Sequence, residues 1–356
     1  MEVIKGVKPL FKIIIGVGIL LLIIGIFTLS LTGPVDRGNK KDVEVTINSG
    51  TSKIEIGQIL KKNDLIKSEF MFKAYIFIHP VKSLKAGTYV FNKDMSLRKI
   101  VSTLEDGSTY NPDLVVLTFK EGKRITDYAR LISDKTNHSY EDVLGVFKDK
   151  EYTKTLISKY WFLTEKILDN NIYYPLEGYL APDTYHFDNK DVKVTEIIET
   201  MLDEMDKKLE KYKDKISKDP HYYMTMASIV ELEGTNTTNR KMIVGIFKNR
   251  LKGGYNLGSD VTTYYAFQKD MTSDLSTELF LRDNPYNTRA VSMVGKMPVG
   301  PICSSESSSI EASVNPTNSD YLFFVADNKG NIFYTKTNAE HDKKVAEIKE
   351  KGDWIW

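Results

Sequence analysis

The stretch HYYMTMASIVELEG, residues 221–234, carries the pattern around which the rest of the chain can be organised. Its apolar residues recur at helical spacing, and the glycine at its end is the residue type that most often follows a helix. On that helix Glu231 shares a face with the small residues Ala227 and Ser228, which leaves space for a ligand. Glu233 continues the apolar stripe and needs a partner if it is buried. Spacing alone also fits a solvated or salt-bridged glutamate at either position.

The composition of the 356-residue chain excludes several classes of protein. Lys and Arg number 49 against 48 Asp and Glu, so the net charge is +1 and we expect no nucleic-acid partner. The single cysteine, Cys303, rules out an internal disulfide and a multi-cysteine metal site, but it leaves the compartment open. The histidines lack metal-ligand spacing, and no Walker loop or dinucleotide fingerprint is present. We therefore expect neither a metal nor a cofactor.

A long apolar run near the N-terminus predicts a membrane anchor. Residues 13–31, IIIGVGILLLIIGIFTLSL, carry no charge and approach the ~20 residues that a membrane-spanning helix needs. A cleaved signal peptide would have a shorter apolar region and a small-residue cleavage site. We therefore interpret residues 13–32 as an uncleaved, single-pass anchor in the cell membrane. Basic residues lie on both sides of the run, so the positive-inside rule leaves its orientation open.

Part of the chain after the predicted anchor repeats. Residues 45–60 and 116–132 each indicate a short strand, a glycine turn and an amphipathic helix. Residues 87–104 and 183–201 each indicate a Thr-Tyr-x-Phe strand, a polar turn and a helix. The pattern fits a duplicated strand-helix unit, although units of this kind also look alike by chance.

The predicted elements divide the chain into unequal parts. Residues 1–12 precede the anchor and residues 33–42 form a linker. The first strand-helix unit, residues 43–107, resembles the LysM type of wall-glycan-binding module. Residues 108–356 form a larger body. The mixture of short strands and helices predicts an α+β fold for both units.

Eight motifs follow one another along the chain from residue 176 onward: LEGYLAPDTYHF (176–187), ASIVELE (227–233), FKNRL (247–251), LGSDVTTYYA (257–266), NPYNTR (284–289), MPVGPI (297–302), VNPTNSDYLFFVAD (314–327) and FYTKTNAEH (333–341). Together with the apolar run, and in this order, they resemble the MltG (YceG-like) family of membrane-bound endolytic murein transglycosylases. An ordered set of motifs is far more specific than any one of them.

The resemblance implies a function and a set of site residues. It implies a lytic transglycosylase that cleaves the MurNAc-GlcNAc bond within nascent glycan strands, leaves 1,6-anhydro-MurNAc ends and so terminates glycan elongation. Glu231 matches the family's catalytic acid in Ala-Ser-Ile-Val-Glu. Four further residues fall on motifs that line the family's substrate cleft and are expected to bind substrate: Glu177, Asp260, Tyr286 and Asn287.

The resemblance also implies location and partners. It makes residues 1–12 cytoplasmic and places the body, with its YceG-like catalytic domain at residues 108–356, outside the cytoplasm. The expected partners are peptidoglycan glycan strands, the cytoplasmic membrane through one N-terminal span, and penicillin-binding proteins with other wall-synthesis proteins.

The sequence departs from the family pattern at several positions, which include Leu232, Val261, Arg289 and Ser304. These departures leave Glu231, Asp260 and Tyr286 in place but put the shape of the cleft in doubt. Two alternatives therefore stay open. One is a non-catalytic, membrane-anchored wall-binding scaffold, and the other is a peptidoglycan hydrolase that uses water with Asp260 as the base.

One carboxyl group can perform the implied chemistry. Ordinary glycosidases use two carboxylates, the second as nucleophile or as base for water. In a lytic transglycosylase the muramic sugar's own 6-hydroxyl attacks the anomeric carbon. A single glutamate then gives its proton to the leaving oxygen and takes the proton of the hydroxyl. Such a group must start protonated, so its pKa must lie above the ordinary value of about 4.3.

Overall fold

The computed structural model describes residues 16, 18–19, 30–107 and 114–354. The chain divides into two compact units, Met1–Pro112 and Asp113–Trp356. Most of the predicted anchor, residues 13–32, lies outside the described residues. Among the residues that are described, no helix is long and apolar enough to cross a membrane.

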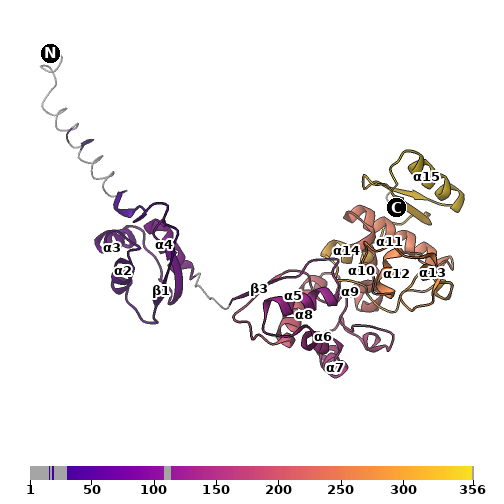
Figure 1. Ribbon diagram of the computed structural model, residues 1–356, viewed down its shortest axis with the longest axis horizontal. Helices are drawn as coiled ribbons and strands as arrows, with labels where there is room; N and C mark the ends of the chain where they lie inside the picture. The colour runs from indigo at the N-terminus through magenta and orange to yellow at the C-terminus, as the bar shows by residue number, and fades with distance from the viewer. Residues whose placement is uncertain (1–15, 17, 20–29, 108–113, 355–356) are drawn as a thin grey trace, which may run out of the picture. The chain divides into compact units, whose positions relative to one another are not determined.

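Between residues 42 and 107, the first unit combines a two-stranded antiparallel sheet with three helices (Figure 1). Serine side chains begin all three helices by accepting a hydrogen bond from the backbone three residues on. Alternate strand residues and one face of each helix form the unit's core. In chain order the elements are β1 (Asp42–Ile47), α2 (Lys53–Lys62), α3 (Glu69–Ile78), β2 (Gly87–Asn92) and α4 (Leu97–Asp106).

The second unit begins with the same order of strand, helix, strand and helix. Two strands pair antiparallel, and an insertion of short helices lies between the first helix and the second strand. The elements are β3 (Val115–Thr118), α5 (Ile125–Lys135), α6 (Tyr140–Lys148), α7 (Lys150–Lys159), η1 (Glu165–Leu168), β4 (Thr184–Phe187), α8 (Val194–Glu210) and α9 (Lys213–Ile216).

The repeat predicted from the sequence is present in the structure down to single side chains. Thr46 lies opposite Thr88 in the first sheet, and their hydroxyl oxygens are 3.1 Å apart. Thr118 lies opposite Thr184 in the second sheet, with hydroxyls 3.0 Å apart. In each sheet the tyrosine after the second threonine donates to the carbonyl four residues before it. Such matching of register and side-chain bonds supports duplication rather than chance likeness.

The rest of the second unit is mostly helical and ends in a small antiparallel hairpin covered by one helix (Figure 1). Its elements are α10 (Pro220–Glu233), α11 (Thr237–Lys252), α12 (Asp260–Ala266), α13 (Thr277–Leu281), η2 (Val291–Met293), α14 (Ser307–Val314), β5 (Phe323–Ala326), β6 (Ile332–Thr335) and α15 (Asn338–Glu350). The helix predicted over residues 221–233 is confirmed as α10, and the mixed α+β fold is confirmed with it.

Helix α10 lies at the centre of the second unit because it belongs to two hydrophobic cores. Met224 and Ala227 pack with α5, α8 and the β3–β4 sheet. Met226, Ile229 and Val230 pack with α11 and α12. Helices α11 and α14 contact α10 directly. A helix that is apolar on nearly every side is buried, so any charged residue on α10 needs a specific partner or an open groove.

Candidate active site

The side chains of the two glutamates at the end of α10 face different parts of the protein. Residues two positions apart on an α-helix are about 200° apart around its axis, because each residue turns the helix by about 100°. Glu231 faces α11 and the start of α14, whereas Glu233 faces the start of α12. The sequence-based expectation that the two carboxylates point in different directions is therefore confirmed.

The Glu231 carboxyl group accepts hydrogen bonds from three donors. Its Oε2 accepts from the Ser309 hydroxyl at 2.7 Å and from the backbone N–H of Glu306 at 3.0 Å. Its Oε1 accepts from Arg240 Nη2 at 3.3 Å, and the side chain is only 4% exposed. Burial raises the pKa of Glu231 above its ordinary value, and the Ser309 hydrogen bond and the Arg240 charge offset only part of that rise. All three partners donate, which is the arrangement that an ionised carboxylate requires.

The space that small residues were expected to leave beside Glu231 is filled by protein. The Ser228 hydroxyl accepts from the Ile302 backbone N–H at 3.0 Å, and the Cys303 thiol donates to the Ser228 carbonyl at 3.3 Å. Residues 302–309 therefore cover this face of α10. Gly234 is needed for a similar reason, since an added Cβ would lie 2.4 Å from Arg240 Cγ. Here the small residues allow close packing of the chain against itself.

Glu233 lies on the other side of α10, where the protein opens. Its Oε1 accepts from the Ser259 hydroxyl at 2.5 Å, and the side chain is partly buried. Burial raises the pKa of Glu233 to about 7, with the negative charge of Asp260 acting in the same direction and Ser259 and Arg289 opposing it. A carboxyl with this pKa is present in both protonation states near neutral pH, which suits a group that first gives and then takes a proton.

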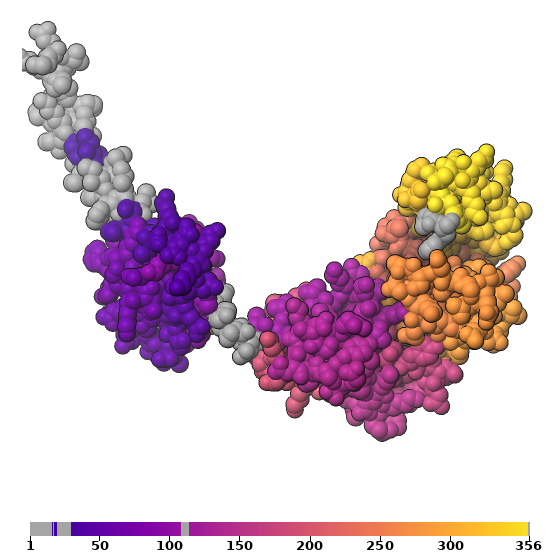
Figure 2. All heavy atoms as spheres, viewed as in Figure 1, coloured from indigo at the N-terminus to yellow at the C-terminus, as the bar shows by residue number. Residues whose placement is uncertain are grey.

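Glu233 is one of the residues that line a groove of about 840 Å³ in the second unit. Figure 2 shows the C-terminal segment (yellow) beside the segment that holds α12 and α13 (orange), and residues from both line this groove. We call it the α12 groove. Its polar and aromatic lining includes Glu233, Arg250, Asp260, Tyr264, Arg289, Phe323, Phe324, His341 and Trp354. Aromatic faces combined with charged groups suit a carbohydrate, which offers both C–H faces and hydroxyls.

Asp260 is the only residue of the predicted site, among those the structure describes, that lines the α12 groove. It begins α12 and forms an ion pair with Arg289 Nη1. Both side chains stay partly exposed, so the pair adds little to stability but places both charges within the groove. Arg289 is one of the departures from the family pattern, and it thus changes the charge of the groove directly.

Tyr286 and Asn287 lie fully buried beneath the groove. The Tyr286 ring packs against those of Tyr173 and Tyr265, with centroids 5.0 and 4.7 Å away. Asn287 Oδ1 accepts from the Thr263 hydroxyl at 2.7 Å. Asn287 Nδ2 donates to three backbone carbonyl groups at the end of α13, those of Leu279, Phe280 and Arg282. Phe280 and Leu281 line the groove, so Asn287 shapes it from below.

Glu177 is also buried, at 1% exposure, away from the α12 groove. Its carboxylate accepts from the Ile125 backbone N–H and from the Tyr265 hydroxyl, each at 3.0 Å. Burial raises the pKa of Glu177 to about 8, against the lowering effect of these two bonds. The residue connects the start of α5 with α12, and so joins the repeated unit to the helix that carries Asp260.

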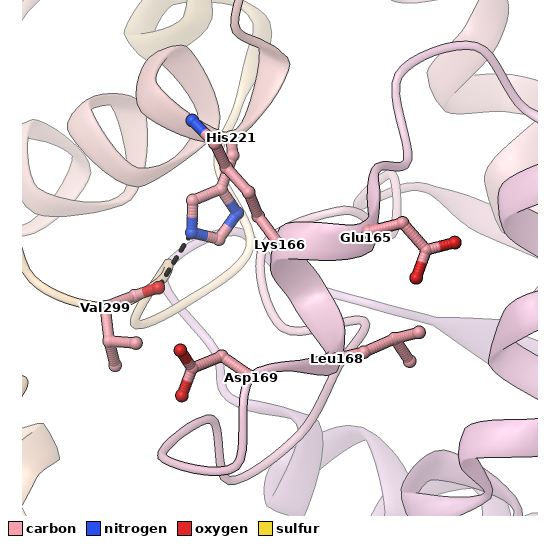
Figure 3. A pocket seen from close by; sticks show the side chains of 6 residues that line it. All are labelled: Glu165, Lys166, Leu168, Asp169, His221 and Val299. Atoms are coloured by element: carbon pink, nitrogen blue, oxygen red, sulfur yellow. Dashed lines mark hydrogen bonds between the residues drawn. The ribbon is translucent and has the colours of Figure 1, made fainter.

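A second hollow, of about 440 Å³, lies at the opposite end of α10 (Figure 3). His221 Nε2 donates to the Val299 carbonyl at 2.7 Å, and Nδ1 accepts from the Tyr179 hydroxyl at 2.8 Å. Burial lowers the pKa of His221, so the ring is neutral. A 14-residue helix is about 20 Å long, which separates this hollow from Glu233. Within the described part of the chain no cluster of three or more His, Cys, Asp or Glu residues could hold a metal ion.

The sequence predicts that a buried Glu233 needs a partner, but it does not identify Ser259 as that partner or Arg240 as a partner of Glu231. The available signal was the placement of Glu233 at the last position of an apolar helix, where an ionisable residue would be costly without an opening to solvent. The structure brings Glu233 and Asp260 together in the groove. It keeps Glu231, Glu177, Tyr286 and Asn287 inside the protein around it.

Comparison with known proteins gives a consistent result. The model of the YceG-like family matches residues 45–347. A Bacillus subtilis (strain 168) protein named endolytic murein transglycosylase is 37% identical over 329 residues, which cover 90% of each chain. A protein of the same name from Streptococcus pneumoniae serotype 2 is 34% identical over 88% of this chain, which spans 60% of that longer relative. The crystal structure of a YceG-like protein from Listeria monocytogenes is 34% identical, with a TM-score of 0.61 over 86% of this chain and 99% of that one.

Proposed function

This chain belongs to the YceG-like family, and we propose that it is an endolytic murein transglycosylase, as its relatives are named. It cleaves the MurNAc-GlcNAc bond within peptidoglycan strands and leaves 1,6-anhydro-MurNAc ends. The observation that carries the proposal is the Glu233 carboxyl group at the wall of an open groove beside Asp260, in a chain that matches the family over residues 45–347. A lytic transglycosylase needs one such group.

The reaction can be written with Glu233 as the only proton carrier. The protonated carboxyl gives its proton to the glycosidic oxygen as the bond from that oxygen to the anomeric carbon breaks. The 6-hydroxyl oxygen of the same muramic sugar forms a new bond to that carbon, and its proton passes to the Glu233 carboxylate. No water is consumed, and the enzyme returns to its starting state. The groove wall shields the developing charge on the sugar from bulk water.

Glu231, the acid that the resemblance implies, stays the alternative acid. Its position in the family motif supports it as the acid, but its three donors are already hydrogen-bonded to it and residues 302–309 cover it. We assign it to holding the end of α10 against α11 and α14. In this scheme Glu233, two residues later, performs the chemistry on a helix end that Glu231 keeps fixed.

The other predicted site residues divide into one groove residue and three supports. Asp260 keeps the pKa of Glu233 high by its charge and contacts the substrate, while Arg289 holds Asp260 in place. Tyr286, Asn287 and Glu177 support α12 and α13 from inside the protein. Their substitution would change the shape of the groove rather than remove a reacting group.

The enzyme's substrate places its action at the cell wall, and the apolar run at residues 13–32 supports a single-pass anchor in the cell membrane. The anchored enzyme acts outside the cytoplasm, on nascent strands beside penicillin-binding proteins and other wall-synthesis proteins. The LysM-like first unit holds glycan near the membrane. Protease added to intact spheroplasts should digest both units, and protection of residues after 41 would exclude this topology.

Analysis of the reaction products tests the proposed function. Purified full-length chain in detergent is incubated with uncrosslinked glycan strands, and the products are examined by mass spectrometry. Internal cuts that leave 1,6-anhydro ends are expected. Reducing ends would instead show a hydrolase. This is the main alternative, because Asp260 supplies a second carboxylate in the groove. Intact strands would indicate a wall-binding scaffold.

A further inference from the structure

Helix α3 in the first unit has large apolar side chains on its solvent-facing side. Phe77 is 85% exposed, Phe70 is 76% exposed and Ile78 is 69% exposed. Phe70 and Phe77 lie two turns apart and therefore share a face. Phe72, on the opposite face, is buried in the unit's core, and Met71 is buried at the side of the helix. One buried face is enough to hold the helix, so the second apolar face indicates contact with another apolar body.

The chain leaves the apolar run beside this same helix. The Ser30 carbonyl accepts a hydrogen bond from Lys67 Nζ, just before α3 begins, at 2.8 Å. Further along, the backbone passes a hollow of about 740 Å³ that is lined by Thr32 and Gly33 of the chain exit, by residues of α3 and by the start of α4. Whatever surrounds the end of the apolar run is therefore next to α3.

We propose that α3 lies in the outer interface of the cell membrane, with Phe70, Phe77 and Ile78 in contact with lipid. The proposal rests on the membrane anchoring proposed above. An apolar run that spans the bilayer must end at the membrane surface, and the structure holds the chain there against α3. On a helix that lies in the membrane interface, Phe and aliphatic side chains are buried at the boundary between headgroups and acyl chains. Lys67 and Lys73 on the same stretch reach anionic headgroups with their long side chains. The first unit is then seated on the membrane rather than loosely tethered to it.

Fluorescence quenching in a bilayer tests this seating. Single cysteines are introduced as Phe70→Cys and Phe77→Cys, with Glu44→Cys on exposed strand β1 as the control. Each full-length variant is labelled with a polarity-sensitive dye and placed in nanodiscs of phosphatidylcholine and phosphatidylglycerol that carry spin-labelled lipid. The native Cys303 is buried, so the unsubstituted chain measures background labelling.

We expect dyes at positions 70 and 77 to emit at shorter wavelength and to be quenched by the spin-labelled lipid several-fold more than the dye at position 44. Equal, water-like emission at all three positions in a chain that stays in the nanodisc would overturn the seating of α3 but keep the anchor. Shielded dyes at 70 and 77 without lipid quenching would show that protein covers α3, which also overturns the proposal. A chain that does not remain with the nanodisc would overturn the anchor and this proposal together.

Discussion

The two sides of α10 carry the same residue type in contrasting surroundings. On one side Glu231 meets three donors and a covering segment, and its side chain is 4% exposed. On the other side Glu233 meets one donor, a neighbouring negative charge and a groove. Burial raises the pKa of both carboxyls, but the Ser309 hydrogen bond and the Arg240 charge oppose the rise at Glu231, whereas the Asp260 carboxylate adds to it at Glu233. The comparison teaches that two residues of one type on one helix can have different surroundings, and the proposed roles of the two glutamates rest on that difference.

The largest expected effect is on activity, from Glu233→Gln. Glutamine keeps the shape and can still accept from Ser259, but it carries no transferable proton. General acid-base catalysis contributes about 10²- to 10⁴-fold, and here one group serves both transfers, so the loss should reach the upper part of that range. The measurement is the rate at which anhydro ends form, with thermal melting as the check on folding. A folded Glu233→Gln protein with near-normal rates would contradict the assignment.

Glu231→Gln should instead reduce stability. Its amide would present two N–H groups to a site where Ser309, Glu306 and Arg240 all donate. A buried mismatch of this kind costs about 1–3 kcal/mol, which should lower the melting temperature by several degrees. Activity per folded molecule should stay close to that of the unsubstituted chain. If Glu231→Gln melts normally and forms no anhydro ends, the acid is Glu231 and the two sides of the helix have been assigned in reverse.

Glu177→Gln should flatten the dependence of stability on pH. The folded-state pKa of Glu177 is about 8 and that of Glu233 is about 7, both above the ordinary value of 4.5. The folded protein therefore binds more protons than the unfolded chain between about pH 4.5 and 8, and its stability falls as the pH rises through that window. Removing Glu177 should recover up to about 4 kcal/mol of the loss at pH 8, because each unit of pKa shift corresponds to about 1.4 kcal/mol. Melting curves at pH 5 and pH 8 make the comparison, and an unchanged slope would count against a protonated Glu177.

Asp260→Asn should have the smallest of these effects, on the pH profile of the reaction. The negative charge of Asp260 helps to raise the pKa of Glu233, and its loss also frees Arg289 to lower that pKa further. The fall in rate on the alkaline side should move to lower pH by up to about one unit, which corresponds to about 1.4 kcal/mol. Asp320→Asn, which breaks an exposed pair with Lys336 outside the groove, is the matched control. If the rate falls at the same alkaline pH in Asp260→Asn and in Asp320→Asn, the charge of Asp260 does not raise the pKa of Glu233.

The sequence predicts those features of the site that depend on interactions between residues close together in the chain. Helix α10, its divergent carboxylates and the repeated strand-helix unit depend on local periodicity, and these are confirmed. The cover over Glu231 comes from Arg240 and residues 306–309, which approach α10 only through tertiary packing. Small residues at 227 and 228 fit either a ligand or a packed segment equally well, so the pattern could not distinguish the two.

The groove itself was harder to predict. Glu233 has the spacing of a core residue. It lines the groove because Ser259 and Asp260, at the start of α12, pack beside it in the folded protein. Tyr286 and Asn287 belong to motifs near the groove, yet their side chains point inward to hold it. A motif therefore marks the neighbourhood of a site without stating which of its residues face the substrate.

Direct titration of the Glu233 carboxyl tests the central claim most closely. In a Glu177→Gln background, which removes the other carboxyl with a pKa as high as about 8, infrared spectroscopy can follow the protonated-carboxyl band between pH 5 and pH 9. We predict a band that disappears around pH 7, persists unchanged when Glu231→Gln is added and is absent when Glu233→Gln is added. A band that survives Glu233→Gln but is lost with Glu231→Gln would contradict the account and transfer the acid to the other side of the helix.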